Sequence, residues 1–425
     1  MKGYNNYKKS KFIWFDKLPE NWVEGKIKYL FKISRGRVIS QLELKSEAKY
    51  PVYSSQTKNN GCLGYIDTFD YEGEMLTWTT DGANAGSVFQ RKGKFNCTNV
   101  CGILIPKQKL ELRYYYYYIA FITQFYKRPD TNGAKIMSNE MAEIHCFIPS
   151  LEEQKKIAYF LDYKTNIIDS TIEKKKNLIK LLKEKRQAVI NDAVTKGSNS
   201  EVRMKESGLK WLGQIPANWD LVPIRYINNK IGSGVTPKGG GDVYTDEGIT
   251  FIRSQNVHFD GLRLDDVVKI DIETHKNMNN SIVQRNDVLL NITGASIGRC
   301  CVVDRIEEMN INQHVCIIRV NEKIIPAFLN IVLQSNVGQT QIKLLTTGGN
   351  REGLTQEAVK NITIPLPDIK TQMELLESIS EKLNIYNLIH VKISNSIEKL
   401  EIYRQSLISE AVTGKIDIRD WKQKK

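Results

Sequence analysis

The chain repeats itself, and this duplication limits its possible folds more than any other feature. Residues 14–22 read WFDKLPENW, and residues 211–219 read WLGQIPANW. A longer match joins residues 149–197 to residues 367–415, which share Pro, Gln, Arg-Gln and Ala-Val-Thr at corresponding places. Solenoids need several short repeats, so two long copies indicate a duplicated domain. The offsets of 197 and 218 predict a second copy about 21 residues longer, in a molecule with pseudo-two-fold symmetry.

Each copy ends in an apolar stripe with helical spacing, over residues 151–196 and 369–413. The stripe recurs every seven residues and keeps its register in both copies, as in a coiled coil. Pro precedes and Gly follows each segment, and neither residue occurs inside. We therefore expect two helices of about 65–70 Å, packed antiparallel; two separate helices, each lying on its own domain, are the alternative. The expected seam consists of Leu161, Ile168, Lys175, Leu182, Val189, Ile172, Ile179, Arg186 and Ala193, with Ile379, Tyr386, Ile393, Leu400, Leu407, His390, Ile397, Arg404 and Ala411.

Two further features of these helices bear on what their side chains contact. Arg186 and Arg404 interrupt the seam at equivalent positions, where they either pair with acidic groups or keep their charged ends in water. Further apolar residues widen the stripe beyond a two-helix seam and predict additional protein partners. They are Ile167, Leu178, Ile190, Ile385, Leu388 and Ile408.

The remaining sequence predicts two α+β domains. Short apolar runs alternate with Gly-rich turns over residues 13–148 and 209–366, which is typical of mixed strands and short helices. The segment from Arg113 to Ala120 reads as one helix whose tyrosines pack in half-buried positions rather than stack on bases. The predicted organisation is a first domain (1–150), a first long helix (151–197), a second domain (198–367) and a second long helix (368–425).

Composition indicates the class of partner. The formal net charge of +13 favours a polyanion, most commonly nucleic acid. Residues 1–150 carry an excess of Lys and Arg, whereas residues 198–367 are balanced, so the first half is expected to make more phosphate contacts. The seven cysteines form no C-x-x-C pair, which suits a reducing compartment, and we expect no metal site. With no signal peptide and no apolar run of membrane-spanning length, we expect a cytoplasmic protein.

Sequence motifs for catalysis are missing. The chain has no phosphate-binding G-x-x-x-x-G-K-[ST] loop, no H-E-x-x-H and no G-x-S-x-G. It also has no Gly-rich methyl-donor loop and no Asn/Asp-Pro-Pro-Tyr/Phe segment, and its five histidines are scattered. We therefore predict a binding protein with no catalytic residues of its own.

Polar side chains gather beside glycines in loops of both domains. Arg, Asn and Gln can read base edges, and Gly lets the backbone approach phosphates. Ordinary turn residues bonded to their own backbone are the alternative. The predicted DNA contacts are Ser55, Gln56, Lys58, Asn59, Thr80, Asp81, Asn84, Lys127, Arg128, Asn132 and Lys135 in the first domain, and Thr236, Lys238, Arg253, Ser254, Gln255, Asn256, Ser296, Arg299, Gln313, His314, Asn350 and Arg351 in the second.

The loops of the two domains correspond, while the polar residues within them differ. This pattern predicts two readers of different short sequences on one scaffold. We align residues 81–86 with 293–298, Val100-Cys101 with Val315-Cys316, Thr98-Asn99 with Gln313-His314, Thr131-Asn132 with Gly349-Asn350, and Ile136 with Leu354.

The order and duplication of these motifs resemble the specificity (S) subunits of type I restriction-modification systems, over essentially the whole chain. The resemblance rests on the two W-x-x-x-x-P-x-N-W segments, on residues 293–299 and 311–315, and on Ile364-Pro-Leu-Pro367 before a long helix that ends Ala-Val-Thr-Gly. The first copy departs from this pattern, because Cys146-Phe-Ile-Pro149 lacks the doubled proline and Asp81 stands at the place of Thr293.

This resemblance implies a division of labour. Each domain would be a target recognition domain that reads one half of a split site on double-stranded DNA, and the helix pair would set the gap between the halves. Methyltransferase (M) subunits, two in number, would dock on the helical regions and flip an adenine in each half-site for N6 methylation. Restriction (R) subunits would join that core. S-adenosylmethionine, ATP and Mg²⁺ would belong to these partners, and this chain would bind no cofactor.

Two other functions stay open at this point. A free-standing regulator of a split operator would be stable and specific alone. A structural adaptor would use its domains to bind protein, and would lack a salt-dependent affinity for DNA.

Overall fold

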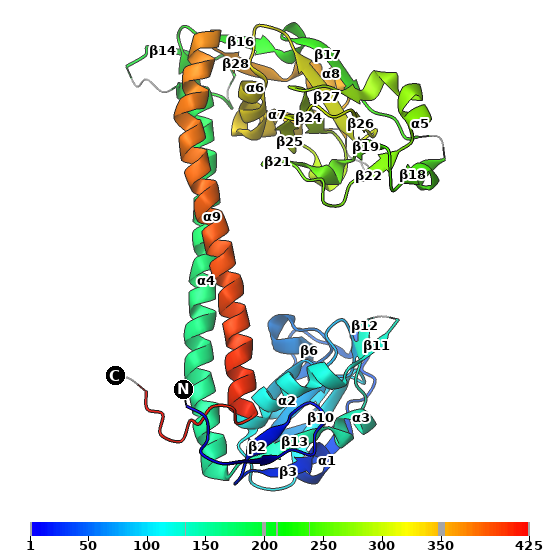
Figure 1. Cartoon of the computed structure of the whole chain (residues 1–425), viewed down its shortest axis with the longest axis vertical. Helices are drawn as coiled ribbons and strands as arrows, with labels where there is room; N and C mark the ends of the chain where they lie inside the picture. Colours follow the sequence, from blue (N-terminus) through cyan, green and yellow to red (C-terminus); the bar gives the residue numbers. More distant parts are fainter. Residues whose placement is uncertain are drawn as a thin grey trace. The chain divides into compact units, whose positions relative to one another are not determined.

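The computed structural model describes residues 2–131, 133–197, 201–209, 211–237, 239–346 and 353–423. The chain divides into two compact units (Figure 1): unit 1 is Met1–Lys176 with Ser394–Lys425, and unit 2 is Asn177–Ile393. Each unit combines a mixed α+β domain with parts of two long helices, which confirms the predicted fold class. In the described part of the chain, no helix is both long and apolar enough to span a membrane.

Unit 1 contains a six-stranded main sheet and several smaller sheets. Its strands are β1 (Tyr7–Lys9), β2 (Lys17–Pro19), β3 (Val23–Lys26), β4 (Phe31–Arg35), β5 (Tyr50–Tyr53), β6 (Cys62–Ile66), β7 (Tyr71–Thr79), β8 (Asp81–Gly82), β9 (Val88–Cys97), β10 (Cys101–Pro106), β11 (Arg128–Asp130), β12 (Gly133–Lys135) and β13 (His145–Ile148). Its helices are α1 (Ile27–Leu30), α2 (Leu112–Tyr126), α3 (Ser138–Glu143), the first part of α4 (Leu151–Lys196) and the last part of α9 (Ile369–Val412).

The main sheet has the order β4-β10-β7-β9-β5-β6, and its neighbours are antiparallel except for the parallel pair β5 and β9. Helix α2 packs on this sheet (Figure 1). Tyr114, Tyr115, Tyr117 and Tyr118 of α2 are buried more deeply than the half-buried positions predicted, and they pack in the core instead of offering a surface for stacking on bases. Smaller sheets pair β1 with β2, β3 with β13, and β12 with both β11 and β8.

Unit 2 repeats this plan with an interrupted sheet. Its strands are β14 (Met204–Glu206), β15 (Gln214–Pro216), β16 (Asp220–Pro223), β17 (Asn228–Ser233), β18 (Tyr244–Thr245), β19 (Ile249–Ile252), β20 (Val257–His258), β21 (Gly261–Leu262), β22 (Val268–Ile270), β23 (Ile282–Val283), β24 (Val288–Asn291), β25 (Cys300–Val302), β26 (Met309–Ile311), β27 (Val315–Val320) and β28 (Thr363–Leu366). Its helices are the last part of α4, α5 (Ile272–Asn277), α6 (Pro326–Gln334), α7 (Asn336–Leu345), α8 (Gln356–Asn361) and the first part of α9.

The sheets of unit 2 are β17-β27-β24-β25 and β18-β22-β19-β26-β23. Where unit 1 has the single strand β9, unit 2 has two, β25 and β26. The parallel pairing of β5 with β9 therefore reappears as the pairing of β19 with β26.

The long helices begin and end as the sequence predicts. Ser150 and Asp368 accept hydrogen bonds from the first-turn backbone N–H groups of Glu153 and Thr371, at 3.3 and 2.9 Å. After the helices, Gly197 and Gly414 have φ angles of +76° and +70°, the left-handed conformation that commonly ends a helix. Both positions favour glycine for that reason.

Helices α4 and α9 pack together in both units. In unit 1, Ile168 and Ile172 of α4 share a cluster with Leu407 of α9. In unit 2, Ala193 of α4 shares a cluster with Ile379 of α9. The start of one helix meets the end of the other in each case, so they run antiparallel, and every predicted seam residue is buried or half-buried.

The two arginines of the seam behave differently. Arg404 forms a bidentate ion pair with Asp169 of α4, at 2.8 and 3.2 Å. Arg186 instead donates to the side chain of Gln334 at 3.5 Å, and burial lowers the pKa of its guanidinium. The repeat places Asn387 at the position equivalent to Asp169, so a carboxylate is lacking there.

Two of the residues predicted to widen the outer apolar stripe are not on the outer surface. Ile190 is fully buried and Ile408 is 9% exposed, because each packs into the core of its own unit. The other four, Ile167, Leu178, Ile385 and Leu388, are exposed by 47 to 62%.

The duplicated tryptophan motifs close each unit around a helix end. Trp22 is buried and lies against Gly414, after α9, while Trp219 lies against Gly197, after α4. The first domain thus packs against the C-terminal end of α9, which follows the second domain. The second domain packs against the C-terminal end of α4, which follows the first domain.

Candidate nucleic-acid interface

A glycine-rich turn has the same geometry in both domains. In residues 81–86 and 293–298, the first Gly has φ of +88° and +70°, and the last has φ of +84° and +86°. The N–H of the last Gly donates to Thr79 in unit 1 and to Asn291 in unit 2, at 2.8 and 2.9 Å. The predicted correspondence of these turns is therefore confirmed.

A helix side chain holds each turn in place by a hydrogen bond. Thr123 of α2 donates to the carbonyl of Gly86 at 3.0 Å, and Gln339 of α7 donates to the carbonyl of Gly298 at 2.9 Å. A Cβ on Gly298 would lie 2.6 Å from the Gln339 side chain. The turns are thus held at fixed positions on the sheet, which a surface that reads DNA needs.

In unit 1, further predicted residues surround the turn. The Asn84 amide donates to the carbonyl of Ser55 at 3.2 Å, which joins the turn to the loop after β5. Lys135 of β12 lies 3.6 Å from Asp81 and 3.4 Å from Asp130. The register of β11 and β12 sets Arg128 opposite Lys135, and Arg128 pairs with Glu140 at 2.7 Å. Such surface pairs are weak, so these cations can still attract phosphates.

In unit 2, the equivalent loops meet through a chain of polar side chains. Asn291 donates to the carbonyl of Ser254 at 2.7 Å. The Thr293 hydroxyl contacts His314 Nδ1, and the other ring nitrogen of His314 lies 3.0 Å from the Gln313 amide. The turn, the loop after β19 and the segment before β27 therefore form one surface.

Two predicted alignments between the domains, Thr98-Asn99 with Gln313-His314 and Val100-Cys101 with Val315-Cys316, are wrong by one residue. Thr98 and Asn312 both donate their N–H to the strand that pairs in parallel, at 2.9 and 3.0 Å. Asn99 therefore corresponds to Gln313, and Val100 corresponds to His314. The error arose because matching the Val-Cys dipeptides ignores the hydrogen-bond register, which sets Cys101 opposite Thr79 and Val315 opposite Asn291. Ile136 and Leu354 do correspond, since each donates to the residue before its turn, at 2.9 and 2.8 Å.

The structure sorts the predicted contact residues by exposure. Exposed are Lys58, Asn59, Lys127, Arg128, Thr236 and Gln255. Half-buried are Ser55, Gln56, Asp81, Asn84, Lys135, Arg253, Ser254, Ser296, Arg299, Gln313 and His314. Asn132, Lys238, Asn350 and Arg351 lie outside the described residues.

Two predicted contacts are buried. The Thr80 side chain is fully enclosed, and Asn256 is 2% exposed. The Asn256 oxygen accepts from the N–H of Arg253 at 3.0 Å, and its amide donates to Arg263 at 2.9 Å. In this conformation both residues support the loops from inside and are not part of the surface.

Four of the eight buried side-chain polar atoms that lack a hydrogen-bond partner in the described part of the chain lie at these loops. Among the described residues, Thr80 Oγ1, Asp81 Oδ1, Arg253 Nε and Asn291 Oδ1 make no hydrogen bond. A buried polar atom left unpaired costs about 1–3 kcal/mol. A polar ligand bound at these loops would offer partners to these four atoms.

Sequence reasoning missed Arg91 of β9. Its side chain is 2% exposed and stacks on the Tyr53 ring, 3.5 Å from the ring centre. It donates to Thr77 at 3.1 Å and to the carbonyl of Asn60 at 2.7 Å. Burial lowers the pKa of this guanidinium. No sequence signal marks Arg91 as buried, because it is followed by Lys92, which is exposed, and so resembles part of a solvated strand.

Arg91 supports a loop with an uncommon backbone. Asn59 and Asn60 have φ of +50° and +53°, and Gly61 continues with +78°. Non-glycine residues seldom adopt this conformation, and it is often found at functional sites. Lys58, Asn59 and Asn60 are exposed, so the loop presents polar side chains outward while Arg91 holds its backbone.

Within the described ranges, no group of three or more His, Cys, Asp or Glu side chains is placed to hold a metal ion. Cys97 and Cys101 are both buried, and the Cys101 thiol has a lowered pKa because it interacts with Cys97.

Comparison with known proteins agrees with this arrangement. A family model described as the type I restriction modification DNA specificity domain matches residues 19–181 and again residues 216–399. A Mycoplasma pneumoniae protein described as the N-terminus of a type I specificity subunit is 45% identical over 139 residues, or 32% of this chain and 74% of that protein. A second M. pneumoniae specificity subunit is 41% identical, over 32% of this chain but only 38% of its own length.

A longer match is the specificity subunit of the EcoBI type I restriction enzyme from Escherichia coli. It is 27% identical over 75% of this chain and 68% of its own length. A solved chain from a study of complex assembly and conformational transition in a type I restriction-modification system shares the fold, with a TM-score of 0.71. That match covers 94% of this chain and 99% of the other at 13% identity. Because the family model matches two long segments in tandem, the chain belongs to the type I restriction-modification specificity family and carries two copies of its DNA specificity domain.

Proposed function

We propose that this chain is the DNA-reading subunit of a type I restriction-modification complex and that it recognises a split sequence. One observation carries the proposal: the same turn, held by the same backbone hydrogen bonds, carries different polar residues in the two domains. Asn84 occupies the position equivalent to Ser296, and Asn99 occupies the position equivalent to Gln313. A conserved frame with different base-reading side chains fits two different half-sites.

Partner subunits would perform the chemistry. In this proposal two methyltransferase subunits methylate adenine at N6, and restriction subunits cleave, in the cytoplasm. S-adenosylmethionine, ATP and Mg²⁺ would be bound by those subunits. Exposed apolar side chains on the long helices support protein docking, since large exposed apolar patches commonly mark interaction sites. They are Ile167, Ile402 and Tyr403 in unit 1, and Leu178, Leu181, Ile385 and Leu388 in unit 2.

The proposal is tested by sequencing methylated bases in a host that expresses this chain with its cognate methyltransferase. We expect N6-methyladenine in a split motif, lost when this gene alone is deleted. Unchanged methylation after deletion would refute the proposal. Binding of the purified chain to DNA at increasing salt would then separate a DNA-binding regulator from a protein-binding adaptor.

Helix length is expected to set the gap between the half-sites. Deleting one heptad from both α4 and α9 shortens each by about 10 Å, which corresponds to about three base pairs of duplex at about 3.4 Å each. The methylated motif should keep both half-sites and change only its spacing. A changed half-site would contradict this role for the helices, and deleting a heptad from α4 alone serves as the control that breaks the seam.

A further inference from the structure

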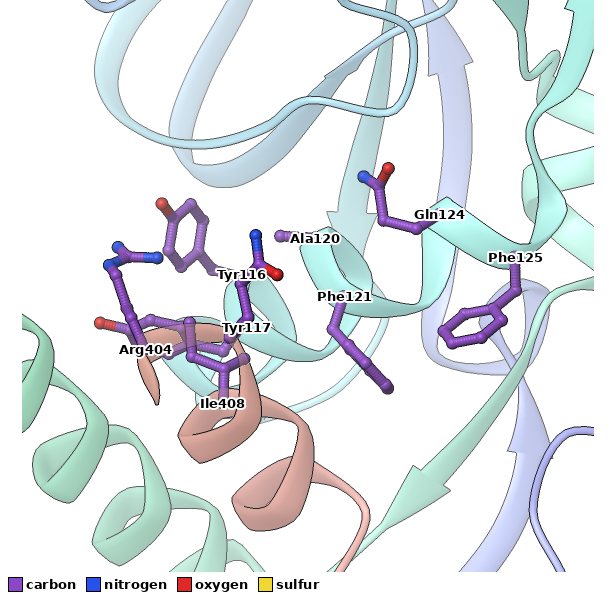
Figure 2. A pocket seen from close by; sticks show the side chains of 9 residues that line it. Tyr116, Tyr117, Ala120, Phe121, Gln124, Phe125, Arg404 and Ile408 are labelled. Atoms are coloured by element: carbon purple, nitrogen blue, oxygen red, sulfur yellow. The ribbon is translucent and has the colours of Figure 1, made fainter. Parts of the chain in front are cut away.

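A cavity of about 580 Å³ opens in unit 1 beside α2 and α9 (Figure 2). Aromatic rings from α2 form much of its wall. Helix α9 contributes two polar side chains and Ile408. The cavity lining includes Tyr116, Ala120, Phe121 and Phe125 of α2 and Arg404 and Gln405 of α9. This volume lies within the usual range for a site that binds a ligand or a peptide segment.

The duplication shows which residues occupy the same place in unit 2. Gln154 and Gln372 are buried at the starts of α4 and α9, and they accept from the N–H groups of Glu111 and Ile325, at 3.1 and 2.8 Å. Glu111 and Ile325 directly precede α2 and α6. Counting from these two anchors, Ala120 of α2 corresponds to Gln334 of α6. On the long helices, Arg404 and Gln405 correspond to Arg186 and Gln187.

Gln334 fills the equivalent place in unit 2. It is 5% exposed. Its side-chain oxygen accepts from Arg186 at 3.5 Å, and its backbone carbonyl accepts from Gln187 at 3.0 Å. Its amide donates to the carbonyl of Phe259 at 3.0 Å. The chain itself thus covers this arginine and glutamine in unit 2, with a helix end that presents oxygen atoms.

Helix α2 cannot do the same in unit 1. Helix α6 stops at Gln334 and α7 starts at Asn336, whose N–H donates to Asn191 of α4 at 2.8 Å. Helix α2 instead continues unbroken from Leu112 to Tyr126. With a methyl group at Ala120 and no helix break, unit 1 has neither the side chain nor the corner that covers the site in unit 2.

From this comparison we propose that the cavity receives a segment of the methyltransferase partner that presents a backbone carbonyl and a side-chain amide oxygen, as the helix end at Gln334 does in unit 2. Gln405 and Arg404 would donate to these oxygen atoms, and Phe121 and Phe125 would pack against the apolar part of the segment. This inference deepens the proposed function and rests on it.

The surroundings fit a protein better than DNA. The Arg404 charge is already balanced by Asp169, so a phosphate would meet little net positive charge. Phe125 is 42% exposed, and Ile402 and Tyr403 of α9 are 60% and 50% exposed. Exposed apolar side chains on both helices of this unit favour a protein partner, since the buried core of a protein interface is more apolar than the rest of the surface.

The test uses the residue that the chain itself places in unit 2. Ala120→Gln fills the cavity from within, while Ala120→Ser leaves it open at the same position. Affinity for the purified cognate methyltransferase subunit is measured with the full-length chain, together with binding to the specific DNA. We expect Ala120→Gln to weaken assembly at least tenfold, Ala120→Ser to assemble normally, and both to bind DNA as the unaltered chain does.

Unchanged assembly of a folded Ala120→Gln variant would overturn the inference. The inference would also be overturned if Ala120→Gln weakened DNA binding and left the affinity for the methyltransferase subunit unchanged. If Ala120→Gln does not fold, Gln405→Ala decides: weaker assembly supports the inference, and normal assembly overturns it. Methylation of a split motif by the unaltered complex is read separately, so failure of the proposed function is distinguished from failure of this site.

Discussion

Replacing Arg91 with Met is expected to relax recognition of one half-site while the other stays strict. Met can fill much of the volume of the buried Arg91 side chain, and the replacement removes the cost of burying its charge. The Asn60 carbonyl, however, loses its donor, and the left-handed backbone of Asn59 and Asn60 loses its support. A misplaced base-reading residue typically costs about 1–3 kcal/mol of discrimination, or roughly tenfold to a hundredfold in preference.

The measurement is selection of bound sequences from a random DNA pool, followed by sequencing. The half-site read by the second domain is an internal control in the same molecule. Lys92→Met, at the exposed neighbouring position, is the matched variant and should lower affinity slightly for all sequences alike. Equal loss of affinity across all sequences in Arg91→Met would show that Arg91 contributes charge only and does not position the loop.

Gly234→Ala should unfold or distort the second domain, whereas Gly232→Ala should be tolerated. A Cβ at Gly234 would collide with the backbone carbonyls of Ile311 and Asn312. At Gly232, on the same segment, the nearest atom would be the end of the Lys230 side chain at 3.9 Å. Forcing backbone apart in a packed region typically costs about 1–3 kcal/mol and occasionally more, and we expect the upper end here because carbonyls on one strand cannot rotate away.

Thermal unfolding and binding of the split DNA site are measured together for both variants. The expected result is a lower unfolding temperature and lost binding for Gly234→Ala, with values near the original for Gly232→Ala. Gly36 has the same relation to the carbonyls of Cys97 and Thr98 in unit 1, so Gly36→Ala should damage the first domain in the same way. Similar stability of the two variants at Gly232 and Gly234 would contradict the argument.

Where the structure differs from the sequence-based predictions, each difference has a physical reason. Ile190 and Ile408 were placed on an outer face because helical spacing describes one helix and not the domain that packs beside it. The loop alignment slipped by one residue because the register of a strand is set by partners distant in the sequence. Thr80 and Asn256 were read as surface residues because the same side chains that contact bases also support turns.

The sequence by itself determined the duplication, the α+β class, the two long helices and their antiparallel seam, since heptad spacing and terminal Pro and Gly are local signals. It also located the two glycine turns, because their positive φ angles require glycine. Only the tertiary structure decided which polar residues reach the surface, that a buried arginine holds the loop at Asn59, and that Gln334 fills in one domain a site that stays open in the other. Such properties depend on contacts between residues far apart in the chain, and burial and hydrogen-bond partners are defined only once those contacts form.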